Sequence, residues 1–126
     1  MCGIIGYSGP KEPLPILING LSRWEYRGYD SAGIAISDGN KITVEKKEGK
    51  LEVLKNHLKD NNIKGNIGIG HTRWATHGVP NDVNAHPHSD NNEEFAIIHN
   101  GIIENYAEIK KDLLEEGFEF KSDTDT

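Results

Sequence analysis

The chain opens with Met1-Cys2-Gly3-Ile4-Ile5-Gly6-Tyr7, followed by Ser8-Gly9-Pro10. The apolar run predicts a short buried strand over residues 3–7, because the turn-forming residues after it end the run. Cys2 precedes this strand and is the only cysteine of the chain, which excludes an internal disulfide and a zinc site of several thiolates. Loss of Met1, which is usual before a small second residue, would leave a thiol and a free α-amine together on Cys2.

After this strand, the rest of the chain shows segments with helical or strand periodicity. Apolar residues recur at helical spacing over residues 13–24, 50–60 and 106–117, and each of these segments is predicted as a helix. Strands are expected over residues 32–36, 41–47, 67–71 and 95–99, the last one buried, with a further strand beginning at Phe118 and Phe120. Residues 73–94 show neither period, and about 22 irregular residues are long enough to indicate a functional loop.

This order of hairpins and helices predicts an α+β fold, with helices packed on antiparallel sheets in one domain over residues 1–126. The chain carries 14 Lys and Arg residues against 20 Asp and Glu residues, a net charge of −6, without a dense basic cluster. This acidic balance argues against nucleic-acid binding, which depends on clustered positive charge. No apolar run approaches the roughly 18 residues of a membrane span, and no signal peptide is recognisable, so a cytoplasmic location without membrane association is expected.

Two features are candidates for nucleophilic catalysis. A thiol is mostly protonated at neutral pH, so a nucleophilic Cys2 needs a base, and its own α-amine, with a pKa of about 7.7–8, can serve. The alternative for Cys2 is a small buried residue at the start of a strand. Asn100-Gly101 follows a predicted strand and offers a side-chain N–H and a backbone N–H side by side, as an oxyanion hole requires. The same dipeptide is also the commonest sequence of a tight turn.

Four charged residues are candidates for binding a charged ligand. Arg73 and Arg27 can each clamp a carboxylate with two parallel hydrogen bonds, or can be solvated or salt-bridged. Asp123 and Asp125 can bind an ammonium group, or can cap a helix or lie on the surface. The residue types alone leave these alternatives open.

Four histidines lie close together in the sequence: His71, His77, His86 and His88. A His-x-His pair can place two imidazoles on one face of a strand, so a metal site is one interpretation. No Asp or Glu has the spacing that would complete a helical metal motif, and the histidines fall in or beside the predicted loop. Hydrogen-bonded loop histidines are therefore the preferred interpretation, and neither a metal nor a cofactor is expected.

Several specific blocks of sequence occur in a fixed order along the chain. They are Met1-Cys2-Gly3-Ile4-Ile5-Gly6, Glu25-Tyr26-Arg27-Gly28-Tyr29-Asp30-Ser31-Ala32-Gly33, Gly70-His71-Thr72-Arg73-Trp74-Ala75-Thr76-His77-Gly78, His86-Pro87-His88, His99-Asn100-Gly101-Ile102-Ile103-Glu104-Asn105 and Ser122-Asp123-Thr124-Asp125-Thr126. Over essentially its whole length the chain resembles the glutaminase domain of the glutamine–fructose-6-phosphate aminotransferase family, a branch of the class II glutamine amidotransferases. Amidophosphoribosyltransferases, the nearest alternative, share the first block and the Asn-Gly pair but differ in the second and third blocks.

The resemblance implies an N-terminal nucleophile hydrolase fold, an αββα sandwich in which two antiparallel sheets lie between layers of helices. It implies that Cys2, after loss of Met1, attacks the side-chain amide of L-glutamine, with Asn100 and the backbone N–H of Gly101 forming the oxyanion hole. Arg73 is implied to bind the α-carboxylate of glutamine and Asp125 its α-ammonium group. The remaining residues implied around the glutamine are Trp74, Thr76 and His77 in a closing loop, His86 nearby, and Arg27 near the nucleophile.

In this family a C-terminal synthase and isomerase region receives the ammonia and aminates fructose 6-phosphate, so that region is the implied partner. Ser122–Thr126 follows a predicted strand start, and we therefore expect the domain to continue beyond residue 126. The alternative from another class is a non-catalytic fragment that binds a partner, or a homo-oligomer that forms through exposed strand edges.

Overall fold

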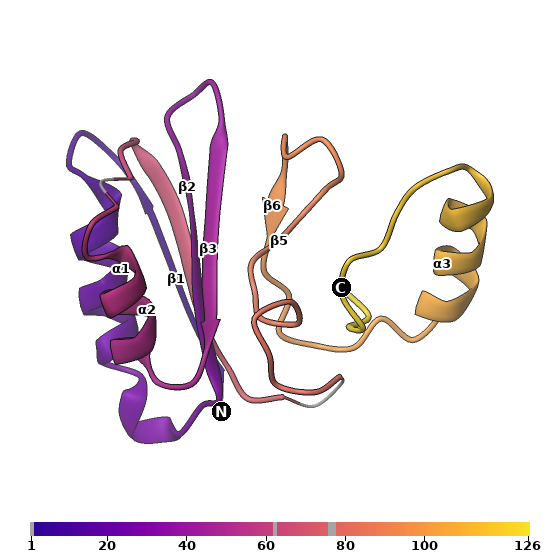
Figure 1. Cartoon of the computed structure of the whole chain (residues 1–126), viewed down its shortest axis with the longest axis horizontal. Coiled ribbons are helices and arrows are strands. Elements are labelled where there is room, and N and C mark those ends of the chain that lie inside the picture. The colour runs from indigo at the N-terminus through magenta and orange to yellow at the C-terminus, as the bar shows by residue number, and fades with distance from the viewer. Residues whose placement is uncertain (1, 62, 76–77) are drawn as a thin grey trace.

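A computed structural model describes residues 2–61, 63–75 and 78–126. The elements of the chain form four successive layers (Figure 1). Helices α1 and α2 cover one face of a four-stranded sheet, a two-stranded sheet lies on its other side, and helix α3 lies beyond that. In chain order the elements are β1 (Gly3–Ser8), α1 (Pro13–Ser22), a 3-10 turn η1 (Glu25–Arg27), β2 (Ser31–Ser37), β3 (Ile42–Glu48), α2 (Leu51–Leu58), β4 (Ile67–Arg73), β5 (His88–Ser89), β6 (Ala96–Ile97) and α3 (Tyr106–Glu115).

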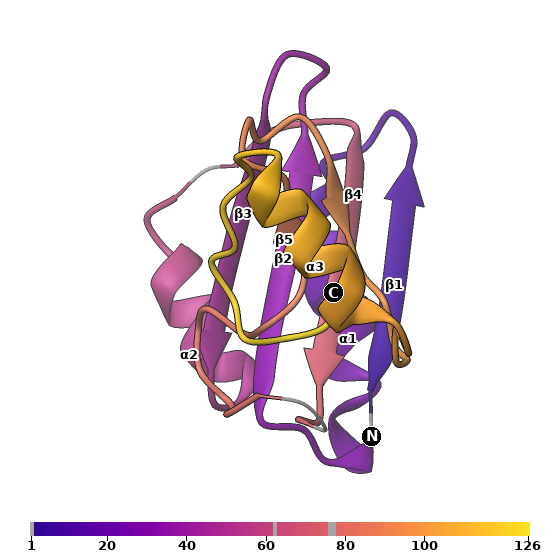
Figure 2. The ribbon, with the colours of Figure 1, turned by 90° about the vertical axis from the view of Figure 1, so that its right-hand side faces the viewer.

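The four-stranded sheet has the order β1-β4-β2-β3, and all its neighbouring strands are antiparallel (Figure 2). The predicted strands at 3–7, 32–36, 41–47 and 67–71 all form, with ends shifted by one or two residues, and the three predicted helices form as well. The first helix ends at Ser22, before the predicted residue 24, and the 3-10 turn η1 follows it. Within the described residues, the helices lack the length and apolar character needed to cross a membrane.

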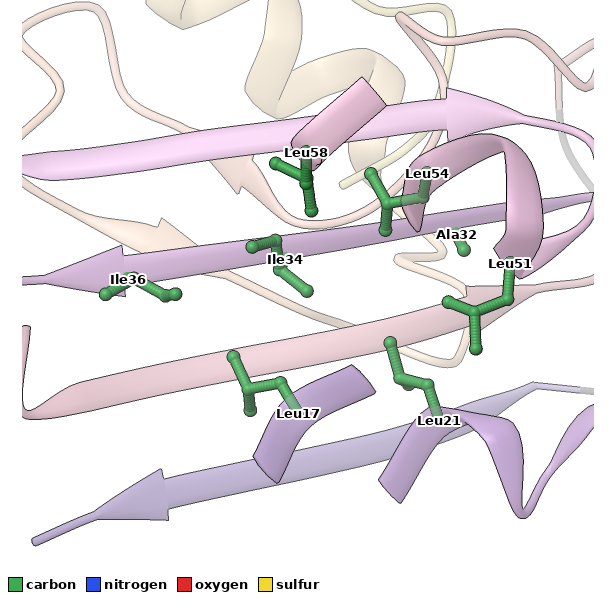
Figure 3. Close-up of a cluster of buried hydrophobic side chains, with 8 residues drawn as sticks. All are labelled: Leu17, Leu21, Ala32, Ile34, Ile36, Leu51, Leu54 and Leu58. Atoms are coloured by element: carbon green, nitrogen blue, oxygen red, sulfur yellow. The ribbon is translucent and has the colours of Figure 1, made fainter. Parts of the chain in front are cut away.

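The hydrophobic core lies between the two N-terminal helices and this sheet (Figure 3). Leucines on one side of each helix meet the apolar side chains of the central strand β2, and burying each such side chain stabilises the fold by roughly 1.5–3 kcal/mol. The cluster consists of Leu17, Leu21, Ala32, Ile34, Ile36, Leu51, Leu54 and Leu58. Because successive side chains of a strand point to opposite faces, the residues between Ala32, Ile34 and Ile36 on β2 face the other side of the sheet.

The opposite face of the sheet carries the polar residues. The register pairs Ser31 with Arg73 and Gly33 with His71, so the side chains of Ser31, His71 and Arg73 lie on one face. The loop before β5 is fastened to this face, because the Lys46 ammonium on β3 donates to the carbonyl oxygens of Val83 at 3.1 Å and Ala85 at 2.8 Å. Lys47 holds Asp82 in the same loop at 3.0 Å.

Gly33 allows this loop to approach the sheet closely. A Cβ atom at this position would lie 2.0 Å from the carbonyl oxygen of His86 and 2.9 Å from the Cβ of Lys46. We expect Gly33→Ala to lower the free energy of unfolding by about 1–3 kcal/mol, since either the strand or the loop must move. Urea denaturation measures the change.

Gly6→Ala is the matched control, because Gly6 is also a strand glycine and a Cβ there would meet only Gly68 O at 4.0 Å. It should change stability by less than about 1 kcal/mol. Equal destabilisation by both substitutions would show that loss of a strand glycine, rather than contact with the loop, determines the effect.

Two predictions in the C-terminal half were wrong. The segment 95–99 forms only the two-residue strand β6, and Phe95 and Ile97 are 67% and 52% exposed, because β6 pairs with β5 alone. The strand expected at Phe118 and Phe120 does not form. Instead, the side-chain amide of Asn91 accepts from Glu119 N at 2.9 Å and donates to Glu119 O at 2.8 Å, so it replaces a neighbouring strand as the partner of this backbone.

Candidate active site

A cavity of about 20 Å³ lies where β1 begins and β4 ends, and it brings together residues from distant parts of the chain. Its lining residues are Cys2, His71, Arg73, Trp74, His86, His99, Asn100, Gly101, Thr124 and Asp125. Seven of the sequence candidates therefore converge here. The cavity has room for about one water molecule, so a larger ligand requires the lining side chains to move. A larger hollow of about 320 Å³, between β5, β6 and the segment after α3, is lined by none of the candidate site residues.

Cys2 lies at the start of β1, directly against the end of β4. Its Sγ accepts a hydrogen bond from the backbone N–H of Trp74 at 3.3 Å and lies 3.9 Å from the carbonyl oxygen of the same residue. Gly3 N donates to Thr72 Oγ1 at 3.1 Å and fixes the neighbouring backbone. Since a backbone N–H favours a sulfur that carries negative charge, this contact suits a reactive thiolate.

Asp30 holds the turn that follows β4. Its carboxylate accepts from the N–H of Ala75 at 2.8 Å, and its own N–H donates to the carbonyl oxygen of Arg73 at 2.8 Å. The turn that carries Trp74 is therefore fixed on both sides. Sequence reasoning missed this role of Asp30, although the residue falls within the Glu25–Gly33 block.

The Asn100-Gly101 pair lines the same cavity as Cys2. A Cβ atom at Gly101 would lie 2.7 Å from His99 Nε2, so any larger residue at this position would have to displace the imidazole. His99 Nδ1 lies 3.2 Å from Thr126 Oγ1, and the Asp125 carboxylate accepts a hydrogen bond from the backbone N–H of Ile103. These contacts connect the Asn-Gly turn to the segment that carries Asp125.

Two histidines form a buried wall of the cavity. His71 is 1% exposed and His86 5% exposed, and their rings meet edge to face at a centroid distance of 4.8 Å. Burial lowers the pKa of His71 to about 3, and burial together with the nearby Arg73 charge lowers the pKa of His86 to about 4. Both rings are therefore neutral at pH 7. Among the described residues, neither ring nitrogen of His71 has a hydrogen-bond partner, and Nδ1 of His86 has none either.

Three candidates are not found among the described lining residues. Arg27 does not line the cavity, because its guanidinium stacks on the ring of Trp24 at 4.5 Å, and that ring in turn lies against Gly3. Thr76 and His77 lie outside the described residues. The part of the chain that the structure describes contains no group of three or more His, Cys, Asp or Glu side chains that could hold a metal.

Sequence reasoning also missed several lining or supporting residues. His99 and Thr124 line the cavity, and each falls within one of the quoted blocks, so block membership was the signal that could have found them. Asp123, a candidate for ammonium binding, is exposed and does not line the cavity, but its N–H donates to Asn84 Oδ1 at 2.8 Å. Its observed contacts are those of a residue that supports the loop.

The layered antiparallel fold and the cysteine at the start of β1 define the class of N-terminal nucleophile hydrolases. Residues 54–126 match the glutamine amidotransferase domain, and the chain belongs to this family. Over its whole length it is 60% identical to the glutamine–fructose-6-phosphate aminotransferase (isomerizing) of Clostridium perfringens and 63% identical to that of Fusobacterium nucleatum. The chain spans 21% of the length of each of these relatives.

Solved structures agree with this assignment. The glutamine phosphoribosylpyrophosphate amidotransferase of B. subtilis, complexed with ADP and GMP, superposes with a TM-score of 0.80 at 32% identity, over 100% of this chain and 27% of that one. The α+β fold and the family resemblance predicted from the sequence are therefore confirmed. The lower identity makes the amidophosphoribosyltransferases a related family, as their differences in the second and third sequence blocks indicated.

Proposed function

We propose that this chain is the glutaminase part of a glutamine–fructose-6-phosphate aminotransferase, which hydrolyses L-glutamine to glutamate and ammonia through a thioester on Cys2. The observation that carries the proposal is the convergence of Cys2, Arg73, Asn100-Gly101 and Asp125 on one cavity. These residues supply a nucleophile, a cation, two N–H donors and an anion, which together match the functional groups of glutamine. The identity of 60% to the Clostridium perfringens relative supports the same assignment.

Arg73 and Asp125 would recognise the two charged ends of the amino acid. Arg73 is 4% exposed, and a buried guanidinium can bind the α-carboxylate through two parallel hydrogen bonds. Asp125 would accept from the α-ammonium group. Because the histidines in the wall are neutral, they add no positive charge that would repel this ammonium group.

The proposed reaction consists of two acyl transfers. After loss of Met1, the α-amine of Cys2 takes the thiol proton, and the sulfur adds to the carboxamide carbon. The side-chain N–H of Asn100 and the backbone N–H of Gly101 stabilise the negative oxygen, each donor contributing roughly 2.7–4 kcal/mol. The amine then gives its proton to the departing ammonia, and water hydrolyses the γ-glutamyl thioester to glutamate.

The other candidates would shape the pocket around the substrate. Trp74, Thr76 and His77 are proposed to form the loop that closes over glutamine, and the Trp74 side chain is 53% exposed beside the cavity. His86 would form part of the wall. Arg27 would act indirectly, without touching the substrate. Its guanidinium supports the ring of Trp24, and this ring lies against Gly3, the residue after the nucleophile.

The ammonia would pass to a C-terminal synthase region that aminates fructose 6-phosphate, in a cytoplasmic enzyme that needs no cofactor for the glutaminase step. Self-association through the exposed strand edges stays a proposal, and gel filtration with light scattering would test it.

One mass measurement tests the glutaminase assignment. The protein is exposed to a diazo-ketone analogue of glutamine, with and without excess glutamine, and its intact mass is recorded. We expect a mass without Met1 and a single adduct on Cys2 that glutamine suppresses. Retained Met1 would remove the catalytic amine, and an adduct that glutamine does not suppress would mean that the cysteine reacts without a glutamine site.

A further inference from the structure

His88 on β5 bridges the sheet and the segment that carries Asp125, although it does not line the cavity. Its Nδ1 lies 3.4 Å from the ammonium nitrogen of Lys46 on β3, and its Nε2 lies 3.0 Å from Thr124 Oγ1. Thr124 is 7% exposed, lines the cavity and directly precedes Asp125 in the chain. A side chain outside the cavity thus contacts its lining.

These contacts determine which ring nitrogen of His88 carries the proton. A lysine ammonium group can only donate hydrogen bonds, and two of its three N–H groups point to Val83 O and Ala85 O. His88 Nδ1 must therefore accept, which leaves the proton on Nε2. The Nε2–H group then donates to Thr124 Oγ1, which also lies 3.0 Å from Ser122 Oγ.

The charges around the ring favour its neutral form. Burial, together with Lys46 on β3, His86 on the adjoining loop, and Arg73 and His71 on β4, lowers the pKa of His88 to about 3. Burial also lowers the pKa of Lys46 to about 8, so Lys46 is mostly protonated at pH 7. The arrangement of donor and acceptor is therefore stable at neutral pH.

A second contact fixes the same segment one residue earlier. The side-chain oxygen of Asn84, which is fully buried, accepts from the N–H of Asp123 at 2.8 Å, and its amide nitrogen donates to Val79 O at 2.9 Å. The segment 123–125 is thus held at Asp123 by Asn84, at Thr124 by His88, and at Asp125 by the N–H of Ile103. Among these contacts, the one through His88 reaches β3 by side chains, because His88 meets both Thr124 and the Lys46 ammonium group.

We propose that His88 is a positioning residue of the glutamine site: as the Nε2–H tautomer it holds Thr124, and it thereby fixes the Asp125 carboxylate where the α-ammonium group of the substrate binds. The inference rests on the proposed function for its substrate. His88 then helps the site to recognise the α-ammonium end of glutamine, and it takes no part in the chemistry at the side-chain amide.

The test compares glutamine with glutaramic acid, which has the same carboxamide but lacks the α-ammonium group. For His88→Leu we expect kcat/KM for glutamine to fall about tenfold, mainly through a higher KM. A tenfold change is the size expected for the loss of one hydrogen bond that supports a charged site. The value for glutaramic acid should change less than about twofold. Thr124→Val, which removes the acceptor with little change of shape, should give the same pattern. His88→Gln should recover part of the loss, because its amide N–H can reach Thr124.

His57→Leu is the control, since His57 on α2 pairs with Glu45 at 2.8 Å and lies outside the cavity lining. If both substrates lose activity equally in His88→Leu and Thr124→Val, the role is only structural and the proposal is overturned. Nitrogen NMR of histidine-labelled protein tests the tautomer without any substrate, and an Nδ1–H signal for His88 would overturn the proposal by itself. Wild-type protein that shows the Nε2–H tautomer but hydrolyses neither substrate would instead refute the proposed function, and with it the role at the substrate.

Discussion

Replacing Cys2 with alanine is expected to lower glutamine hydrolysis by roughly 10⁴-fold or more, because the thioester can no longer form. Alanine is also small, so removal of Met1 should proceed as before and the α-amine should stay in place. Within the described residues, the hydrogen bonds of the Sγ atom are the two with the Trp74 backbone, so the free energy of unfolding should change by less than about 1 kcal/mol. Ammonia release, measured with a coupled dehydrogenase assay, gives the loss of activity.

The same variant separates binding from chemistry. Arg73 and Asp125 are unchanged in Cys2→Ala, so calorimetry should still detect glutamine, with an affinity within a few-fold of the wild-type value. Cys2 is the only cysteine, so a thiol reagent that inactivates the wild-type protein should leave the variant unmodified. Hydrolysis by Cys2→Ala at more than about 1% of the wild-type rate would contradict a thioester mechanism.

Local patterns in the sequence were sufficient to predict the strands and helices of the N-terminal half of the fold. Strand β2 and helices α1 and α2 supply the buried residues of one core, and Ile5 and Tyr7 of β1 pack against it, so periodicity and burial agree in these elements. The prediction was wrong at Phe118 and Phe120 because these phenylalanines line the hollow beside α3, while the amide of Asn91 satisfies the intervening backbone. A side chain that replaces a strand partner leaves no periodic signal.

The candidate site was predictable to the extent that its residues fall in specific blocks. Cys2, Asn100 and Asp125 converge on the cavity, while Arg27 is separated from it by the ring of Trp24. The supporting contacts of Asp30, Asn84 and His88 were not predictable, because each joins segments that lie 36 to 45 residues apart in the sequence. Such contacts depend on tertiary structure and not on residue spacing.

Mild acid is expected to destabilise the protein strongly, because three neighbouring histidines are buried in the neutral form. Burial lowers the pKa of His71 and His88 to about 3 and that of His86 to about 4, from an ordinary value of 6.5. The unfolded chain therefore binds more protons than the folded one between pH 6.5 and about 3 to 4. The contribution of each neutral ring to the free energy of unfolding is fully present above pH 6.5 and is lost as the pH falls through this range.

The expected loss is large relative to ordinary protein stability. At pH 5 the titration of each ring should lower the free energy of unfolding by roughly 2 kcal/mol relative to pH 7, and the three together by roughly 6 kcal/mol, against total stabilities of about 5–15 kcal/mol. Urea denaturation at pH 7, 6 and 5, followed by the fluorescence of Trp24 and Trp74, measures this change. The depressed pKa values of Asp38, Asp82 and Asp90 act only below their ordinary value of 3.8, so they do not contribute in this range.

His88→Gln provides the matched comparison, because glutamine cannot titrate at this position. The variant should lose about a third less stability between pH 7 and pH 5 than the wild type, whatever its stability at pH 7, since one of three rings no longer takes up a proton on unfolding. The carbon-bound ring protons of His71, His86 and His88 should not shift between pH 7 and pH 5 in NMR spectra of the folded protein. If these signals titrate near pH 6.5, the rings are accessible to protons in the fold, and the acid sensitivity must come from other groups.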